Sequence, residues 1–445
     1  MSSIKFHNNS EYSRDRQKQI ENTARCRLSL GQFMSRDQYN RYIPKGIAYH
    51  VPSPSDSSYE SIYNKGLSGS GKTWGGYSLA GQTFFAEKRT WIIFDTKRSY
   101  IGNTRPNIKF KKQLEANGLF PMGIPPENMH VISPKQYIDM AASKDPDEIR
   151  RSWITAPYRV PLRFCSLHTM FEITNQNKNA QYATTFNEVF KQIIAEEGAE
   201  ITLEHINQRI LEILSKPEYA RSRSIIKQML ARIEDMDSHI ESGVEWSSVG
   251  KALMKAKETA EPQWIVVTFA LGDTIDDQTN FAMMSAILIE LKVFAEKAKT
   301  MNWPVKLGVM IDELHAFTKD KKSSTRYMIH DLIHMWGRTN KIIRLVMTQF
   351  DSQLDKEFRD TINLKNYIGS GTYSFVNEFK TIPTPGTITH LNRQMPNKHE
   401  PEKPILYPRV LSCPPLFEVE SDMYDNNEWT KWAKRYYRKE YIDND

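Results

Sequence analysis

The stretch NKGLSGSGKTWGG, residues 64–76, has the residue types and the spacing of a phosphate-binding loop. Gly66 is followed by four residues and then by Gly71, Lys72 and Thr73, which is the pattern G-x-x-x-x-G-K-[ST]. Small residues let backbone N–H groups converge on phosphate oxygens, and a following helix presents its positive end to them. Lys72 would reach the β- and γ-phosphates, and Thr73 would hold Mg²⁺ through its hydroxyl. The alternative is a Gly/Ser-rich turn without a ligand. The predicted nucleotide-binding residues are Gly66, Ser68, Gly69, Ser70, Gly71, Lys72, Thr73 and Trp74.

An acidic pair follows an apolar run in the segment VMIDELHAF. Asp312, at the end of the run, is suited to the Mg²⁺ shell together with Thr73. Glu313 is suited to polarise a water molecule for in-line attack on a γ-phosphate. The alternative is that the two acids only cap the helix that follows, since acidic side chains favour helix N-termini. With a phosphate loop upstream, the pair predicts nucleotide hydrolysis.

The segment MWGRTNKIIRLVMTQF contributes two further candidates. We expect Gly337 to end a helix, which would leave Arg338 in a loop before a strand that ends at Thr348 and Gln349. Gln349 is suited to sense the γ-phosphate or to orient water. Arg338 is suited to enter a neighbouring subunit's site as an arginine finger, and the alternative is a surface arginine. The predicted catalytic residues are Lys72, Glu313, Gln349 and Arg338.

Apolar runs that alternate with helical patterns predict a parallel sheet with helices on both faces. In such sheets ligands bind at the carboxyl ends of the strands, so Asp95, the 312–313 pair and Gln349 should gather beside the phosphate loop. The strand before that loop, SIYNK, is polar, which predicts a short strand or one near a sheet edge. The apolar runs are 89–100, 129–133, 263–271, 305–313 and 341–349.

Helical spacing dominates from about residue 165 to 260, and this range predicts an all-helical insertion. One of its helices should begin near Thr202, and a separate apolar stripe from Phe281 to Ala295 predicts a helix after the insertion. A weaker helical pattern lies around residues 16–34. The predicted parts are an N-terminal extension (1–55), the two parts of an ATPase domain (56–160 and 261–380) around the insertion (161–260), and a C-terminal extension with a basic and aromatic helix (381–445).

The composition narrows the protein class. Among 445 residues, 39% are hydrophobic and 25% are charged, which is typical of a soluble protein. We expect no integral membrane segment, because no apolar run approaches the length of a membrane-spanning helix, and no secretory signal. Three distant cysteines, Cys26, Cys165 and Cys413, form no metal-binding spacing and indicate a reducing, cytoplasmic compartment. The net charge of +7 is compatible with a polyanionic partner.

Together, the phosphate loop and the segments IIFDTKRSY, VMIDELHAF and GRTNKIIRLVMTQ resemble the HerA/FtsK superfamily of ring-forming ATPases. The resemblance covers roughly residues 45 to 380. It implies a RecA-like P-loop NTPase core with a mainly parallel sheet, ATP and Mg²⁺ as cofactors, and a homo-oligomeric, hexameric ring. Ser99 stands where the family's second-strand motif has a glutamate, and we expect no membrane anchor in the N-terminal part, unlike in FtsK or the TrwB-type coupling proteins.

Two functions remain open at this point. The first is a translocase on double-stranded DNA, for genome packaging, DNA transfer or DNA processing. The second is a secretion or pilus-assembly ATPase with a protein cargo, acting with a portal or secretion partner in a virion or at a membrane. Basic residues 319–326 and the helix around residues 428–441 are candidate DNA contacts, with a solvated loop and a packed aromatic face as the alternatives. We do not expect a DEAD/DEAH-type helicase, because such enzymes need a second RecA-like domain and only 96 residues follow Gln349.

Overall fold

The structure is a computed structural model that describes residues 27–36, 42–52, 61–65, 71–145, 147, 149, 152–164, 202–217, 239–270, 277–318, 323–349, 364–368, 387–396 and 404–419. The chain divides into two compact units. Unit 1 comprises residues 1–129, 305–316 and 333–445, and unit 2 comprises residues 130–304 and 317–332. The five-part division expected from the sequence stays a prediction.

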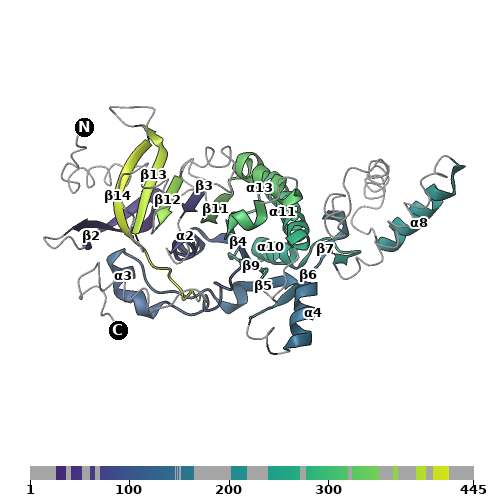
Figure 1. Cartoon of the computed structure of the whole chain (residues 1–445), viewed down its shortest axis with the longest axis horizontal. Coiled ribbons are helices and arrows are strands. Elements are labelled where there is room, and N and C mark those ends of the chain that lie inside the picture. Colours follow the sequence, from purple (N-terminus) through teal and green to yellow (C-terminus); the bar gives the residue numbers. More distant parts are fainter. Residues whose placement is uncertain are drawn as a thin grey trace. The chain divides into compact units, whose positions relative to one another are not determined.

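Unit 1 is built on one sheet, whose strands lie in the order β2, β1, β14, β13, β12, β3, β11, β10, β4 (Figure 1). From β12 to β4 every neighbouring pair is parallel, and from β2 to β12 every pair is antiparallel. The bounds are β1 Arg27–Arg36, β2 Tyr42–Pro52, β3 Ser61–Lys65, β4 Arg89–Asp95, β10 Lys306–Ile311, β11 Ile343–Thr348, β12 Leu364–Ile368, β13 Thr387–Pro396 and β14 Pro404–Ser412.

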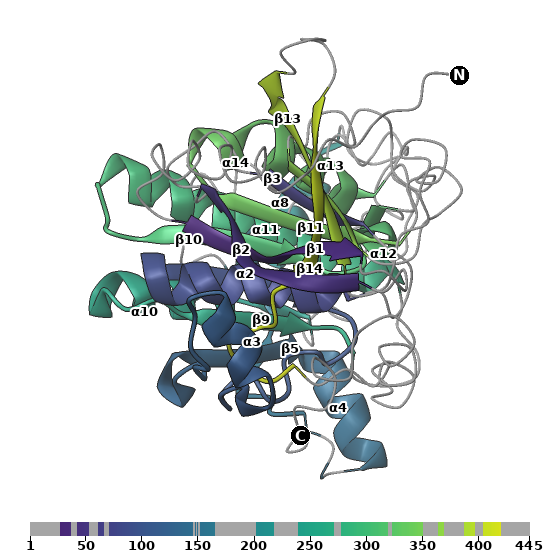
Figure 2. The same ribbon diagram turned by 90° about the vertical axis from the view of Figure 1, so that its left-hand side faces the viewer.

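The parallel strands form the core of unit 1. All seven residues of β4 and all six of β11 are buried, and in β10 only Lys306 is exposed. Continuous burial of this kind is expected of a parallel strand with both faces covered. Helix α2, Lys72–Glu87, packs against β3, β4, β10 and β11 and also contacts β1 (Figures 1 and 2). The other helices of unit 1 are η1 (Ile108–Phe110), α3 (Lys111–Ala116), η2 (Pro126–Asn128) and α14 (Trp336–Thr339).

One expectation about unit 1 is confirmed and another needs correction. Strand β3 is short, with five residues, which confirms the first of the two expectations from its polar sequence, and it lies between β11 and β12 rather than at an edge. Its polar residues Ser61 and Asn64 are buried, because backbone pairing on both sides holds the strand inside the sheet. The helical pattern around residues 16–34 is wrong over residues 27–34, where β1 pairs with β2 and β14. Tertiary pairing overrides weak local propensity here.

The segment Cys413–Val419 ties the end of β14 to α2. The Ser78 hydroxyl donates to the Pro414 carbonyl at 3.2 Å, and the Phe417 ring packs edge-on against Tyr77. A Cβ atom at Gly81 would come within 2.8 Å of the same ring. The close approach of Phe417 therefore requires a glycine at position 81, and the segment packs against the helix that starts at Lys72.

Unit 2 contains strands β9, β5 and β6 side by side in that order, with β5 and β6 parallel. A two-stranded parallel ladder of β7 and β8 lies apart from them. Helix α8 begins beside Thr202, whose hydroxyl accepts the His205 N–H, as the sequence predicts. The bounds are β5 Met129–Pro134, α4 Lys135–Lys144, β6 Ala156–Tyr158, β7 Val160–Pro161, η3 Leu162–Phe164, α8 Leu203–Ser215, β8 Ile240–Glu241, α10 Ser248–Thr259, β9 Trp264–Thr268, α11 Asp277–Thr300, α12 Leu314–Thr318 and α13 Ser324–His334. Met129, the first residues of α12 and the last of α13 belong to unit 1. Within the described ranges, none of the helices combines the length and the apolar character that a membrane crossing needs.

Candidate nucleotide-hydrolysis site

The site begins at the N-terminus of α2. Gly71 occupies the N-cap position of α2 in a left-handed conformation, with φ of 94°. As a glycine it offers no side chain to the N–H groups of the first turn. The first turn of α2 carries no acidic residue. The N–H groups at this end therefore have neither a capping side chain nor an acidic residue within their own turn of the helix, which suits an anion. The predicted loop residues Gly66, Ser68, Gly69 and Ser70 lie outside the described residues.

The Lys72 side chain is buried, with 4% of its surface exposed. Burial lowers the pKa of Lys72, and the negative charges of Glu313 and Asp312 oppose that shift. The lysine is thus a cation held among carboxylates at the start of α2. Trp74, two residues further on, is partly exposed and packs edge-on against Phe110, with 5.0 Å between the ring centroids.

Asp312 follows β10 and is almost completely buried. Its Oδ2 accepts a hydrogen bond of 3.2 Å from the Thr73 hydroxyl, and its Oδ1 accepts one of 2.9 Å from the Glu313 N–H. Burial raises the pKa of Asp312, whereas the nearby charges of Lys97 and Lys72 lower it. A hydroxyl and a carboxylate oxygen side by side are the hard ligands that Mg²⁺ prefers, so these two residues fit the predicted metal position.

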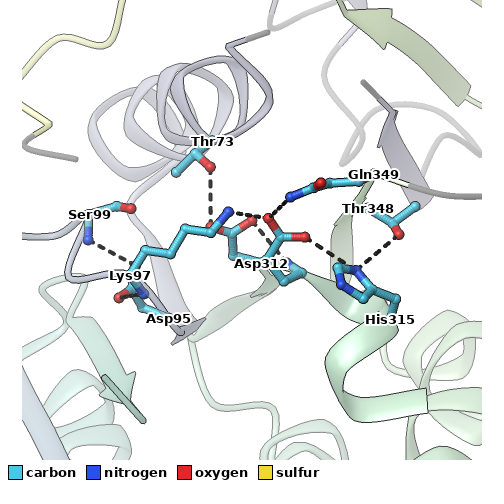
Figure 3. A network of polar contacts seen from close by, with 9 residues as sticks. Thr73, Asp95, Lys97, Ser99, Asp312, His315, Thr348 and Gln349 are labelled. Atoms are coloured by element: carbon cyan, nitrogen blue, oxygen red, sulfur yellow. Dashed lines mark hydrogen bonds and ion pairs between the residues drawn. The ribbon is translucent and has the colours of Figure 1, made fainter. Parts of the chain in front are cut away.

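Glu313 extends the site toward β11. Its Oε1 accepts hydrogen bonds from the Lys97 ammonium and, at 2.8 Å, from Gln349 Nε2 (Figure 3). Burial favours a raised pKa for Glu313, but the hydrogen bond and charge of Lys97 outweigh it, so the pKa is lowered. The backbone of Glu313 is left-handed, with φ of 50°. A non-glycine residue in this conformation costs free energy and is typical of functional sites.

The second oxygen of Glu313 has a different environment. Oε2 is buried and lies 3.2 Å from His315 Nδ1, without the geometry of a hydrogen bond. The same histidine nitrogen lies 3.5 Å from the Thr348 hydroxyl. Burial lowers the pKa of His315, which favours the neutral imidazole. A buried carboxylate oxygen without a hydrogen-bond donor is well placed to accept one from water.

The Asp95 carboxylate binds the backbone of the turn that follows β4. Its carboxylate accepts the N–H groups of Lys97 at 3.0 Å, Arg98 at 2.5 Å and Ser99 at 3.1 Å. Burial and the charge of Asp312 raise the pKa of Asp95 to about 6, against the effect of these three hydrogen bonds. Asp95 therefore holds the turn after β4, from which the Lys97 side chain reaches Glu313.

Arg338 lies in the short helix α14, Trp336–Thr339, and is exposed. The expectation that Gly337 ends a helix is wrong, because α13 already ends at His334 and Gly337 lies inside α14. The turn at Met335, with φ of −119° and ψ of −86°, separates the two helices. The arginine-finger role of Arg338 stays a prediction.

Sequence reasoning missed Lys97 and His315 as parts of this site. Lys97 follows Asp95 by two residues, and His315 follows Glu313 by two, so both stand just beyond the strand ends that the sequence did identify. Among the candidate DNA contacts, Arg326 lies on α13, while residues 319–322 and the C-terminal helix around 428–441 lie outside the described residues.

No protein-family model matches the chain, and no curated protein does. Among solved structures, VirB4 of Thermoanaerobacter pseudethanolicus is similar at a TM-score of 0.50 and 10% identity, over 85% of this chain and 96% of that one. The bacterial conjugative coupling protein TrwBdeltaN70 has a TM-score of 0.42 and 11% identity, over 81% and 79%. The genome packaging NTPase B204 from Sulfolobus turreted icosahedral virus 2, in complex with AMP, has a TM-score of 0.33 and 10% identity, over 79% and 98%.

The likeness to VirB4 shows the fold alone, an α/β P-loop ATPase core with a mainly parallel sheet. The fold class predicted from the sequence is therefore confirmed.

Proposed function

We propose that this chain is a Mg²⁺-dependent ATPase whose hydrolysis drives a double-stranded DNA translocase with a ring of identical subunits. The observation that carries the ATPase assignment is the meeting of the α2 N-terminus with Asp312, Glu313 and Gln349 in unit 1. Lys72 would contact the β- and γ-phosphates, and Thr73 and Asp312 would hold the Mg²⁺. Mg²⁺ supplies charge neutralisation at the phosphates when it is bound.

Within this proposal, Glu313 activates the attacking water. Gln349 donates to its Oε1, and its buried Oε2 has no hydrogen-bond donor, so Oε2 is placed to accept a hydrogen bond from water. Gln349 holds the same carboxylate by its Nε2, and it is placed to transmit the state of the γ-phosphate to β11. Arg338 is exposed, as it must be to act on the site of a neighbouring subunit.

Duplex DNA is favoured over protein as cargo by the net charge of +7. The process that the translocase serves is genome packaging, DNA transfer or DNA processing, and we place the protein in the cytoplasm. The alternative is a secretion or pilus-assembly ATPase with a protein cargo.

The test is the ATPase rate of a size-defined oligomer with and without duplex DNA, at several salt concentrations. We expect DNA to stimulate hydrolysis and its binding to weaken steeply with salt, because phosphate contacts release counterions. Lys72→Ala is the matched inactive control, since it removes the main cation at the phosphates. Hydrolysis that depends on Lys72 but ignores DNA would favour the protein-cargo alternative. Hydrolysis that survives Lys72→Ala would refute the site itself.

A further inference from the structure

Lys97 makes a contact that nucleotide hydrolysis does not by itself require. Its ammonium is bound to Oε1 of Glu313, the carboxylate assigned to activate water. The Lys97 side chain is 23% exposed, whereas that of Glu313 is 6% exposed. The lysine therefore reaches the buried carboxylate from the more open side of the site.

The surroundings of Lys97 allow its side chain to move without its backbone. Asp95 accepts the N–H groups of residues 97, 98 and 99, which fixes the turn that carries the lysine. A lysine side chain is a point charge on a flexible four-carbon stem, unlike the planar fork of arginine. The ammonium can therefore change partners while the turn stays in place.

Glu313 can lose Lys97 without leaving Oε1 unpaired. Gln349 Nε2 donates to the same oxygen at 2.8 Å, so one hydrogen bond remains after the ammonium leaves. The exchange thus avoids the full cost of a buried acceptor without a donor. The presence of two donors on one oxygen is what makes Lys97 dispensable to Glu313 and available to another anion.

Lys97 also lies within electrostatic range of the predicted phosphate position. Burial is the largest influence on the pKa of Asp312, and the charge of Lys97 is the next. Burial is also the main cause of the lowered pKa of Lys72; the charge of Glu313 opposes that shift, and the charge of Lys97 adds to it. Lys97 therefore acts electrostatically on both Asp312 and Lys72, the residues proposed to hold the metal and the terminal phosphate.

We propose that Lys97 senses the γ-phosphate. Its ammonium leaves Glu313 for the terminal phosphate when a nucleoside triphosphate binds, and this movement releases the carboxylate to engage water. A nucleoside diphosphate lacks the γ-phosphate, so Lys97 stays bound to Glu313. The Glu313 carboxylate is therefore released to bind water only when a γ-phosphate is present. This inference rests on the proposed function, because it needs the nucleotide at the α2 N-terminus.

The first test compares the affinities for ATPγS and for ADP in wild type, Lys97→Ala, Lys97→Gln and Lys97→Arg. We expect Lys97→Ala and Lys97→Gln to weaken ATPγS binding by about tenfold or more, since one charge-assisted hydrogen bond is lost, with ADP affinity unchanged within about twofold. Lys97→Arg keeps the charge and should retain part of the preference. Equal losses for both nucleotides, or no loss for either, would overturn the sensor.

A double-mutant cycle tests the exchange of partners directly. Glu313→Gln removes the negative charge that holds Lys97, so ATPγS should bind more tightly than to wild type. That gain should disappear when Glu313→Gln is combined with Lys97→Ala, because no ammonium is left to transfer. If the gain persists in the double variant, Glu313 acts on the phosphate without Lys97, and the proposal is wrong.

Two controls separate this proposal from the ATPase assignment. Lys109→Ala removes an exposed lysine of η1, in the same unit, and should leave both affinities unchanged. Lys72→Ala should lose both nucleotides. If Lys72→Ala binds ATPγS and ADP as wild type does, the nucleotide site is elsewhere and both proposals fall. If it loses them while Lys97→Ala keeps the wild-type preference, only the sensor falls.

Discussion

Two buried glutamates, Glu313 in unit 1 and Glu290 in unit 2, have opposite environments. Glu290 lies on α11 with no exposed surface, and a single residue satisfies both of its oxygens. The Ser247 N–H donates to Oε1 at 2.8 Å, and the Ser247 hydroxyl donates to Oε2 at 2.6 Å. A Cβ atom at Gly250 would come within 2.3 Å of Oε1, so no space for a ligand remains beside it.

Glu313, by contrast, is satisfied on one side only. Its Oε1 has two donors, its Oε2 has none with hydrogen-bond geometry, and its backbone is left-handed. Burial raises the pKa of Glu290 to about 7, whereas Lys97 brings that of Glu313 below its usual value. A carboxylate with both oxygens hydrogen-bonded, like that of Glu290, stabilises the fold. A carboxylate with one oxygen lacking a donor, on a strained backbone and beside cations, is typical of a ligand-binding site.

We expect the largest effect on the hydrolysis rate from Arg338, the residue that a neighbouring subunit would supply to the site. Arg338 is exposed on α14, and as an arginine finger it would stabilise charge on a γ-phosphate held by a neighbouring subunit. Arg338→Ala should lower the hydrolysis rate by about 10³-fold or more and leave ATP binding intact. The measurement is steady-state ATPase activity beside nucleotide affinity.

Complementation decides whether Arg338 acts between subunits. Once subunit exchange is demonstrated, mixing Arg338→Ala with Lys72→Ala should restore some activity, because an interface with an intact Lys72 and an intact Arg338 re-forms one site. Without such rescue, Arg338 acts within its own chain or not at all, and the main argument for a closed ring is lost.

Glu313→Gln should reduce turnover by about 10²- to 10⁴-fold, because an amide cannot polarise water as a carboxylate does. Nucleotide binding should not be weakened and the melting temperature should be preserved, which separates Glu313 from Glu290. Glu290→Gln is the matched variant, and it should change stability while kcat stays the same. A parallel loss of binding, turnover and stability in Glu313→Gln would assign Glu313 a structural role and remove the contrast.

Much of the candidate site could be predicted from the sequence, because phosphate and metal chemistry impose short local patterns. Lys72 and Thr73 are adjacent in one motif, and Asp312 and Glu313 in another. The Lys97–Glu313 pair could not be predicted in the same way, since it depends on which strands are neighbours. The pair becomes intelligible once β4 and β10 are known to be paired, with Phe94 opposite Ile311.

The fold shows the same limit in different elements. The continuously apolar β4 and β11 were predicted, because burial on both faces leaves a clear sequence signal. The polar β3 left its position in the sheet open, and β1 gave the wrong element type, because backbone pairing with distant segments decides both. The contact of Glu290 with Ser247 leaves no local pattern either, since it joins α11 to the start of α10.

A smaller effect is expected for the pH dependence of stability in unit 2. Burial is the main cause of the raised pKa of Glu290, which goes from 4.5 to about 7, while Ser247 and Arg163 oppose the shift and Glu241 adds to it. The folded chain then holds this proton more tightly than the unfolded chain, so its stability falls as pH rises from about 4.5 through 7. Relative to Glu290→Gln, wild type should lose at most roughly 3 kcal/mol across this window.

Denaturant unfolding of wild type and Glu290→Gln at pH 5, 6, 7 and 8 measures this difference, with other titrating groups common to both proteins. A difference that does not change with pH would show that Glu290 titrates alike in the folded and unfolded chain. A wild type that gains stability on going to higher pH would reverse the assignment, and Glu290 would be a carboxylate stabilised by its charge.

The smallest effect should come from Ser247→Ala. The Ser247 hydroxyl caps α10 by accepting the N–H groups of Val249 at 3.0 Å and Gly250 at 3.3 Å, and it also donates to Glu290. Loss of an N-cap costs about 0.5 to 2 kcal/mol, and we expect the upper part of that range because Glu290 loses a donor too.

Ser248→Ala is the matched control. The Ser248 hydroxyl is partly exposed and donates to the Pro157 carbonyl, so its loss should cost less than about 0.5 kcal/mol. Because Ser247 donates both hydrogen bonds to Glu290, the losses of unfolding free energy in Ser247→Ala and Glu290→Gln should not add when the two are combined. Additive losses, or equal losses for the two serines, would mean that Ser247 does not stabilise the fold through Glu290.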